Sequence, residues 1–363
     1  MMPNDELRAR LTVWFRAQLP TAHHVSIEGL DRVDFGFSAE MMVLTLVSQV
    51  DGTEDRQDVV VRLCPPSPGL LEPYDLKRQF DILRALEHTA VRVPRALWMA
   101  DTDKVLGRPF FVMERVDGQV YELTVPDELD ADPHRIPRMC ASMAEQLAAI
   151  HSVDLTATGL DTLGDGRTYL DREIAHWRSE IHRVQRGPLP ALERLIQALR
   201  DTQPEAYPTV TLVHGDAKPG NFAFVDDQVS AVFDWEMAGI GDPLADIGWM
   251  ELLWMQPVGI TSRPSSPTID EFIAHYEAAS GITVRNRNWY RAFQAFKMAA
   301  ILLVGSMLVD GGFSDDIRHA ENAVGISMLT QLALYELGVE GDFETGPVEP
   351  RPERVEALRR TSA

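Results

Sequence analysis

The chain has 363 residues, of which 45% are hydrophobic and 25% are charged, and these proportions exclude a wholly disordered protein. Its formal net charge of −21 disfavours binding to nucleic acid, because the phosphate backbone would be repelled. Cys64 and Cys140 are too few for a disulfide framework or a four-cysteine zinc site, and they are typical of a reducing cytoplasm. The N-terminus is polar and does not resemble a signal peptide, so we expect a cytoplasmic protein.

The first third of the chain combines strands with one helix. Met41–Val50 and Asp58–Leu63 are rich in β-forming residues on either side of a polar turn, which predicts a hairpin. Apolar residues recur at helical spacing over Asp75–Leu86 and predict a helix, and Arg108–Val116 predicts a further strand.

The remainder of the chain predicts mainly helices. Residues 121–137 and 256–268 are rich in turn-forming residues and predict loops. The most apolar stretch, Met298–Val309, would span about 18 Å as a helix, which is short of the ~30 Å core of a bilayer. We therefore expect a buried helix there and no membrane association. The predicted helices are Ile136–His151, Leu189–Leu199, Asp270–Ala279 and Trp289–Val309.

Three polar residues in the segment 209–246 carry the functional argument. A short apolar strand ends just before Asp216, Asn221 follows, and Asp234 comes after two further strand-like runs. An Asp, a nearby Asn and a second Asp beyond a hairpin are typical of kinase-type phosphoryl transfer. In that layout Asp216 accepts the proton of the attacking hydroxyl, and Lys218 could neutralise charge on the γ-phosphate.

The hairpin register brings two of these residues together. If Asp226 faces Val229 across the turn, Asn221 faces Asp234, with Cα atoms about 4.5–5.5 Å apart. An amide oxygen and a carboxylate at one point suit Mg²⁺, which takes few protein oxygens and completes its shell with phosphates. The alternative is that these residues only cap turns and strand ends.

Three motifs in order resemble the aminoglycoside phosphotransferase family: residues 214–221 (HGDAKPGN), 234–236 (DWE) and 241–246 (GDPLAD). The resemblance covers residues 25–335, and it is nearest the branch related to the kinase-like domains of certain acyl-CoA dehydrogenase fusions. It implies an α+β, bilobal protein-kinase-like fold. We then expect a nucleotide-binding lobe with an antiparallel sheet over residues 1–116. A mainly helical catalytic and acceptor-binding lobe would cover 117–340, and a tail 341–363.

The resemblance also implies residue roles in the larger lobe. Asp216 would be the catalytic base, and Asn221 and Asp234 the metal ligands. Asp246 would support the catalytic loop through hydrogen bonds, and His214 would be a structural imidazole. Phosphotransferases of this kind use ATP as co-substrate and Mg²⁺ as cofactor.

In the nucleotide-binding lobe, Gly36 and Ser38 stand where the family has its phosphate loop, although a glycine beside a serine is common in ordinary loops. Arg62 occupies the place of the nucleotide-binding lysine, and its fork suits two phosphate oxygens; the alternative is a surface arginine on an edge strand. In the family, the helix that follows usually supplies a Glu that pairs with this basic residue, but here the residue is Gln79. The sequence leaves Glu72 or Asp75 as possible substitutes.

The strand Phe110–Val116 runs into the connection between the lobes. The family's connecting backbone reads the adenine edge, so Glu114 and Val116 are candidates by position, and Met113 would line the back of the pocket. A plain core methionine is the alternative for Met113.

We expect the acceptor on the helical lobe, near loops within 159–187 and 249–267. These hold Trp177, Trp249 and Trp254 beside Asp165 and Glu251. An acidic rim would suit an aminocyclitol or another polyamine, and the aromatic residues would equally suit an acyl or ring-bearing alcohol; the alternative is that the acidic residues are only solvated. The leading hypothesis is thus an ATP- and Mg²⁺-dependent kinase of a small-molecule hydroxyl, aminoglycoside-like by family default. The alternatives are a kinase of a hydroxyacyl-CoA or other metabolic alcohol, and a nucleotide-binding protein without catalysis.

Overall fold

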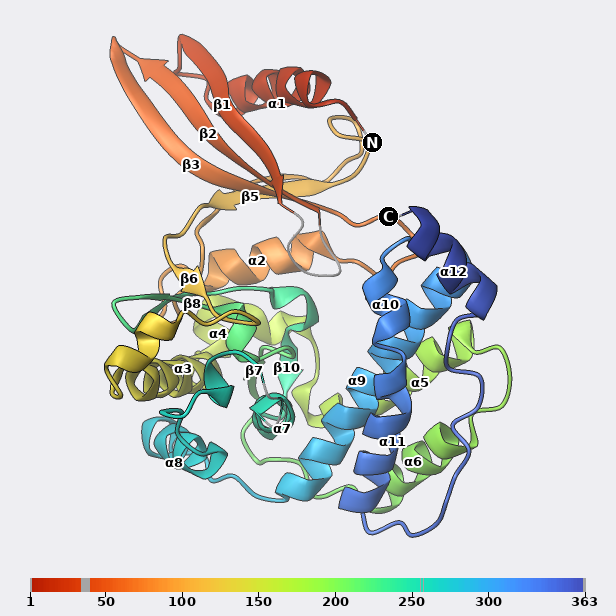
Figure 1. Ribbon diagram of the computed structural model, residues 1–363. Helices are drawn as coiled ribbons and strands as arrows, with labels where there is room; N and C mark the ends of the chain where they lie inside the picture. Colours follow the sequence, from red (N-terminus) through yellow and green to blue (C-terminus); the bar gives the residue numbers. More distant parts are fainter. Residues whose placement is uncertain (1, 34–39, 255, 257, 362–363) are drawn as a thin grey trace.

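The computed structural model describes residues 2–33, 40–254, 256 and 258–361. Figure 1 shows a smaller part built on a curved sheet above a larger part made mainly of helices. This arrangement of an antiparallel sheet and a helical body confirms the predicted α+β, two-lobed fold.

The sheet of the smaller lobe has five antiparallel strands in the order β1-β2-β3-β5-β4. The predicted hairpin is confirmed, since Val50 pairs with Thr53 across a turn in which Asp51 and Gly52 both have positive φ. The strands β1 and β4 were not predicted. The strands are β1 (His24–Val33), β2 (Glu40–Val50), β3 (Thr53–Leu63), β4 (Ala96–Ala100) and β5 (Phe110–Glu114).

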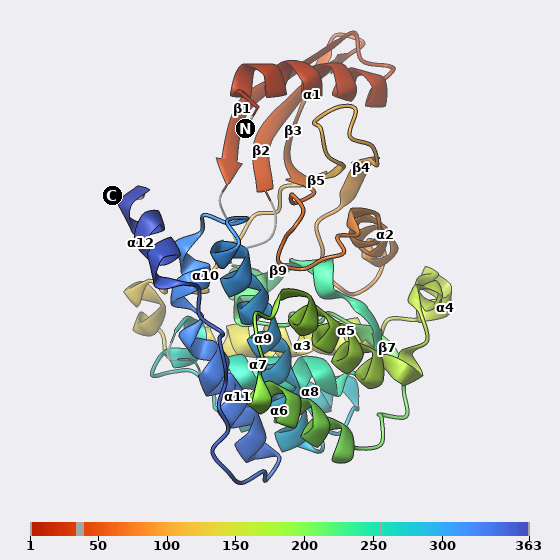
Figure 2. The same cartoon turned by 90° about the vertical axis from the view of Figure 1, so that its right-hand side faces the viewer.

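The two faces of β3 have different partners. Val59 and Val61 are fully buried in a cluster with residues of α1 (Asn4–Gln18), which covers the outer face of the sheet in Figure 2. Because side chains alternate along a strand, Val60 and Arg62 face the larger lobe instead. Val60 accordingly packs against the main core cluster. Because of this alternation, the side chain of Arg62, the candidate phosphate-binding residue, points toward the larger lobe.

The predicted helix over 75–86 is confirmed as α2 (Leu76–Leu86), which lies between the sheet and the larger lobe (Figure 1). Asp75 caps it by accepting a hydrogen bond from the Arg78 amide. The segment that leads from β3 to α2 reaches across to the larger lobe, where Leu70 packs against Val304 and Leu308.

All four helices predicted in the larger lobe are confirmed within three residues at each end. The long apolar helix α9 could span a membrane by length and composition, but 83% of its most apolar window is buried inside the protein. The helices are α3 (Arg135–His151), α4 (Leu155–Thr158), α5 (Tyr169–Val184), α6 (Pro190–Asp201), α7 (Leu244–Trp254), α8 (Ile269–Ser280), α9 (Arg287–Asp310), α10 (Ile317–Glu321), α11 (Val324–Glu336) and α12 (Pro352–Thr361).

The structure adds helices to two regions in which only loops or a tail were expected. The segment 159–187, within which loops were expected, also holds α5, whose buried residues Leu170, Ile174, Trp177 and Ile181 recur at helical spacing. The tail contains α12, and the chain just before it is fixed where Asp310 accepts from the Arg351 amide at 2.7 Å.

Two small sheets frame the candidate site. β7 (Thr211–Val213) pairs with β10 (Gly239–Gly241), and β8 (Phe222–Val225) lies between β6 (Gln119–Val120) and β9 (Gln228–Val232). Short 3-10 turns fill the connections; they are η1 (Asp127–Ala131), η2 (Leu160–Leu163), η3 (Gly166–Thr168), η4 (Pro219–Asn221), η5 (Trp235–Met237) and η6 (Ile260–Ser262).

The register predicted for the β8–β9 hairpin was wrong by two residues next to the turn and by one residue at Asn221. Val225 pairs with Gln228, so the turn consists of Asp226 and Asp227, and both adopt positive φ. The carbonyl of Asn221 accepts from the Phe233 amide at 2.8 Å, so Phe233 and not Asp234 lies opposite Asn221. A two-residue turn with both residues in the left-handed region is favoured in hairpins, and it shifts the pairing by two positions. A register shift between Ala223 and Phe224 then reduces the difference to one position at Asn221.

Candidate active site

The candidate catalytic loop leaves β7 through a turn that only glycine fits. Gly215 has φ +82°, and a Cβ at this position would lie 2.2 Å from the Met237 carbonyl oxygen. The backbone therefore bends sharply at Gly215 and presents Asp216 beyond the end of the strand.

A buried carboxylate holds this loop from below. Asp246, at the start of α7, accepts hydrogen bonds from the amides of His214 and Gly215 at 2.7 and 2.8 Å. His151 lies 3.1 Å from the same carboxylate and 2.6 Å from the Tyr276 hydroxyl. Burial alone would raise the pKa of Asp246, but the contacts with His151 and His214 outweigh it and lower that pKa. The geometry is that of the supporting role expected for Asp246.

Both ring nitrogens of His214 form hydrogen bonds with backbone groups. Its Nδ1 accepts from the Asp216 amide at 3.2 Å, so the Nε2–H donates to the Phe233 carbonyl at 2.8 Å. This ring ties the catalytic loop to the end of the β8–β9 hairpin, which agrees with a structural imidazole.

Lys297 of α9 also contacts the loop, and sequence reasoning missed it. Its side chain is buried, and Nζ donates to the Gly215 carbonyl at 2.6 Å and lies 4.9 Å from the centre of the Trp249 ring. Burial lowers the pKa of Lys297. The signal that could have found it is a lone lysine on the apolar face of a helix expected to be buried.

Asp216 and Asn221 lie together as the motif predicts. Asn221 Nδ2 donates to the Asp216 carboxylate and to its backbone carbonyl, each at 2.8 Å. Burial raises the pKa of Asp216. Lys218 also lies near Asp216, but its Nζ forms an ion pair with Glu122 at 2.8 Å. Burial opposes the charge of Lys218, and Asp216 and Glu122 outweigh this effect and raise its pKa.

Asp234 follows the hairpin with φ +66°, an unusual conformation for a residue other than glycine. Its Oδ1 lies 3.0 Å from Arg62 Nη2 of the smaller lobe. Among the described residues no three His, Cys, Asp or Glu side chains gather as metal ligands. The amide oxygen of Asn221 and the carboxylate of Asp234 are hard donors. Such a short protein ligand set fits Mg²⁺, which takes its remaining ligands from phosphates and water.

The structure describes only part of the candidate nucleotide site. Gly36 and Ser38 lie outside them. Arg62 is buried and faces the larger lobe, and within the described residues its Nε–H has no hydrogen-bond partner. An orphaned buried donor next to the catalytic residues fits a bound phosphate. Arg62 is therefore not the exposed edge-strand arginine of the alternative reading.

Beside Arg62, the sheet presents an apolar surface suited to a flat ring. Val60 pairs with Val43 on one side and Met113 on the other. Met113 is buried, and Val43 and Val60 are half-buried. Sequence reasoning missed both valines, although Val60 lies two residues before Arg62 on the same face of its strand.

The predicted adenine-reading residues lie where the chain leaves β5. The Glu114 side chain accepts from the Arg95 amide at 3.0 Å, and the Glu114 amide donates to the Arg95 carbonyl. The half-buried Val116 lies two residues further along the same connection. Because its side chain and amide are both bonded to Arg95, the backbone carbonyl is the group of Glu114 that could accept a hydrogen bond from an adenine edge.

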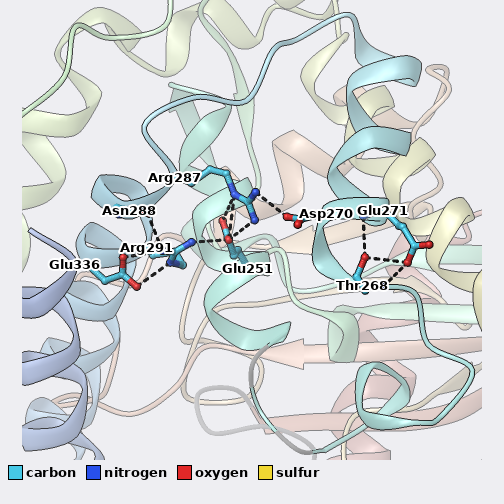
Figure 3. A network of polar contacts seen from close by, with 8 residues as sticks. All are labelled: Glu251, Thr268, Asp270, Glu271, Arg287, Asn288, Arg291 and Glu336. Carbon is cyan, nitrogen blue, oxygen red and sulfur yellow. Dashed lines mark hydrogen bonds and ion pairs between the residues drawn. The ribbon is translucent and has the colours of Figure 1, made fainter.

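Of the two carboxylates expected near the acceptor, Asp165 is exposed, whereas Glu251 is not available to a ligand. Glu251 is buried and paired with Arg287 and Arg291, each at 2.6 Å, in the network that Figure 3 shows. The three tryptophans expected near the acceptor, Trp177, Trp249 and Trp254, are buried as well. The cause is that α5 and α7 form helices here and turn these side chains into the core.

Comparison with known proteins identifies the family. Residues 46–293 match the phosphotransferase enzyme family. The chain is 34% identical over 261 residues to mouse acyl-CoA dehydrogenase family member 10, covering 68% of this chain and 24% of that protein. It is 30% identical over 284 residues to rat acyl-CoA dehydrogenase family member 11, covering 74% of this chain and 36% of that protein. The chain thus spans roughly a quarter to a third of these relatives.

Solved structures agree on the fold. A putative aminoglycoside phosphotransferase from Ralstonia eutropha superposes with a TM-score of 0.70 at 22% identity, covering 92% of this chain and 99% of that one. A choline/ethanolamine kinase family protein from Mesorhizobium loti gives 0.57 at 16% identity, covering 99% and 100%. Aminoglycoside phosphotransferase APH(4)-Ia, in a complex with ADP and hygromycin B, gives 0.54 at 16% identity, covering 92% and 99%. With this kinase-like fold and the sequence match over most of its length, the chain belongs to the phosphotransferase enzyme family.

Proposed function

We propose that the protein is an ATP- and Mg²⁺-dependent kinase that transfers the γ-phosphate to a hydroxyl of a small molecule. The observation that carries the proposal is the grouping of Asp216, Asn221, Asp234 and Arg62 between the lobes. Asp216 and Asn221 are in hydrogen-bond contact, and Asp234 lies 3.0 Å from Arg62. A protein that only bound nucleotide would not need Asp216 beside this set.

Each residue has a defined task in the proposed reaction. The acceptor hydroxyl oxygen attacks the γ-phosphorus, the bond to the β–γ bridging oxygen breaks, and ADP leaves with that electron pair. The hydroxyl proton passes to the carboxylate of Asp216, which Asn221 orients. A Mg²⁺ held by Asn221 and Asp234 would neutralise charge on the β- and γ-phosphate oxygens when bound. Arg62 would bind the phosphates through its free Nε–H.

Lys218 would complete the charge balance near the γ-phosphate. Its ammonium now pairs with Glu122, whose side chain is 37% exposed. A dianionic γ-phosphoryl group is a stronger partner than one solvated carboxylate, so we propose that Lys218 leaves Glu122 when ATP binds.

Two acceptor classes compete. The solved neighbours favour an aminoglycoside-like acceptor, and the acyl-CoA dehydrogenase relatives favour a hydroxyacyl-CoA or another metabolic alcohol. The burial of Glu251 in ion pairs removes a carboxylate that would have bound an aminoglycoside ammonium. We therefore place the hydroxyacyl-CoA first.

The test measures ADP release with ATP and Mg²⁺ over a panel of hydroxyacyl-CoAs, aminoglycosides and amino alcohols. Asp216→Asn should abolish turnover and keep nucleotide binding. Asp226→Asn is the matched control, because Asp226 is an exposed turn residue at positive φ, where Asn is also tolerated. Nucleotide binding without turnover on any acceptor would instead favour the non-catalytic alternative.

A further inference from the structure

Arg62 has an unusual source of negative charge in this chain. The resemblance led us to expect an acid on α2, where Gln79 is buried instead. The proposed substitutes Glu72 and Asp75 are wrong. Asp75 caps α2, and Glu72 accepts from the Gly69 amide at 3.2 Å.

The larger lobe supplies the carboxylates. Arg62 Nη2 lies 3.0 Å from Asp234 Oδ1 and 3.0 Å from Glu236 Oε2. Glu236 belongs to the short turn η5, which contacts α2 and follows the β8–β9 hairpin. Burial lowers the pKa of Arg62, but Asp234 and Glu236 outweigh it, so the net shift is upward and the arginine is charged.

The two carboxylates differ in their access to solvent. The side chain of Asp234 is 29% exposed, whereas those of Glu236 and Arg62 are each 9% exposed. An exposed carboxylate can turn toward an incoming cation at little cost. A buried carboxylate that moved away from a buried guanidinium would give up a short ion pair inside the protein, which is costly. Asp234 is therefore the partner of Arg62 that can exchange for another ligand, and Glu236 is the partner that stays.

From these contacts we propose that Glu236 is the positioning residue of Arg62, in place of the missing acid on α2, so that the nucleotide-binding arginine is held from the opposite lobe. When Asp234 turns to the cation, Glu236 keeps the guanidinium fork in place, with its Nε–H directed to phosphate. This inference rests on the proposed function, since it assumes that Arg62 binds phosphate.

The test measures ADP affinity by calorimetry on the full chain, with Mg²⁺ and with EDTA. Glu236→Gln should weaken ADP binding about tenfold in both conditions, the size expected for a hydrogen bond to a charged group. Gln79→Met, which keeps the buried volume on α2, should leave ADP affinity unchanged. A loss seen only with Mg²⁺ would overturn the inference, because it would make Glu236 a metal ligand.

A double-mutant cycle protects the test against misfolding. If Glu236 acts through Arg62, Arg62→Met and the double variant Arg62→Met/Glu236→Gln bind ADP equally well. The double variant also removes the uncompensated charge, and its melting temperature reports whether the fold is kept. A double variant clearly weaker than Arg62→Met overturns the inference. No ADP binding by the folded wild-type chain would instead contradict the proposed function itself.

Discussion

The candidate catalytic loop and the candidate nucleotide-binding face of the sheet are held in different ways. The loop around Gly215 is fixed within its own lobe by Asp246 and Lys297, which are both buried. On the nucleotide-binding face, Arg62 is fixed by residues of the opposite lobe. Asp216, the proposed catalytic base, is therefore set in place by folding of the larger lobe. Arg62, the proposed phosphate-binding residue, also depends on how the two lobes meet.

The largest expected effect is at the base of the loop. Asp246→Ala removes the acceptor of two loop amides and the partner of His151, which leaves several buried donors unpaired. We expect a loss of at least about 3 kcal/mol in the free energy of unfolding. Urea unfolding checks it against Asp103→Ala, an exposed aspartate of the smaller lobe. Equal stabilities would show that the larger lobe does not fix the loop in this way.

A smaller effect is expected at Lys297. Lys297→Met leaves the Gly215 carbonyl without its buried donor, at a cost of about 1–3 kcal/mol. If that cost falls on the placement of Asp216, kcat drops about ten- to hundredfold while KM for ATP is unchanged. Steady-state kinetics measure both constants, with the exposed Lys104→Met as control. A rise in KM with kcat intact would mean that the loop and the nucleotide site are coupled.

The pH dependence of stability sharpens the same contrast. The pKa of Asp246 is lowered on folding, so the unfolded chain binds its proton at higher pH. The stability that this group adds is complete above its unfolded pKa of about 4. It is lost as the pH falls through the folded value. Urea unfolding across acidic pH should show this decline in the wild type and a shallower one in Asp246→Ala. Parallel profiles would rule out the contribution of Asp246.

The smallest effect is expected on the exposed face of α2. Lys77 and Asp81 form an i,i+4 ion pair whose side chains are 67% and 49% exposed. Water and salt screen such a pair, so Asp81→Asn should change neither the melting temperature nor ADP affinity. Differential scanning calorimetry and titration with ADP test this, and a clear change in either would link the outer face of α2 to the nucleotide site.

What the sequence could predict follows the same division. The order of Asp216, Asn221 and Asp234 predicted their grouping, because short loops and one hairpin fix these distances locally. The error in the hairpin register came from a turn type that depends on Asp226 and Asp227 adopting positive φ, and from the register shift between Ala223 and Phe224. Local pattern alone does not specify that choice.

Long-range contacts account for the other misses. The pairing of Arg62 with Glu236 joins residues 174 positions apart, and no local spacing announces it. Lys297 reaches Gly215 across 82 positions for the same reason. The prediction that Glu251 would face the acceptor was wrong because Glu251 pairs with two arginines of α9. The sequence shows which carboxylates lie near one another along the chain, but it does not show which of them are already paired.

The docking of Leu70 against Val304 and Leu308 has a mechanical consequence. The chain crosses between the lobes near β6 at one edge of the molecule and through the β3–α2 segment at the other (Figure 1). Rotation about the first crossing alone would separate Leu70 from Val304 and Leu308 and expose their apolar surfaces to water. Exposure costs a free energy of about 25 cal/mol per Å² of apolar surface. The second crossing thus restrains rotation of the smaller lobe against the larger one.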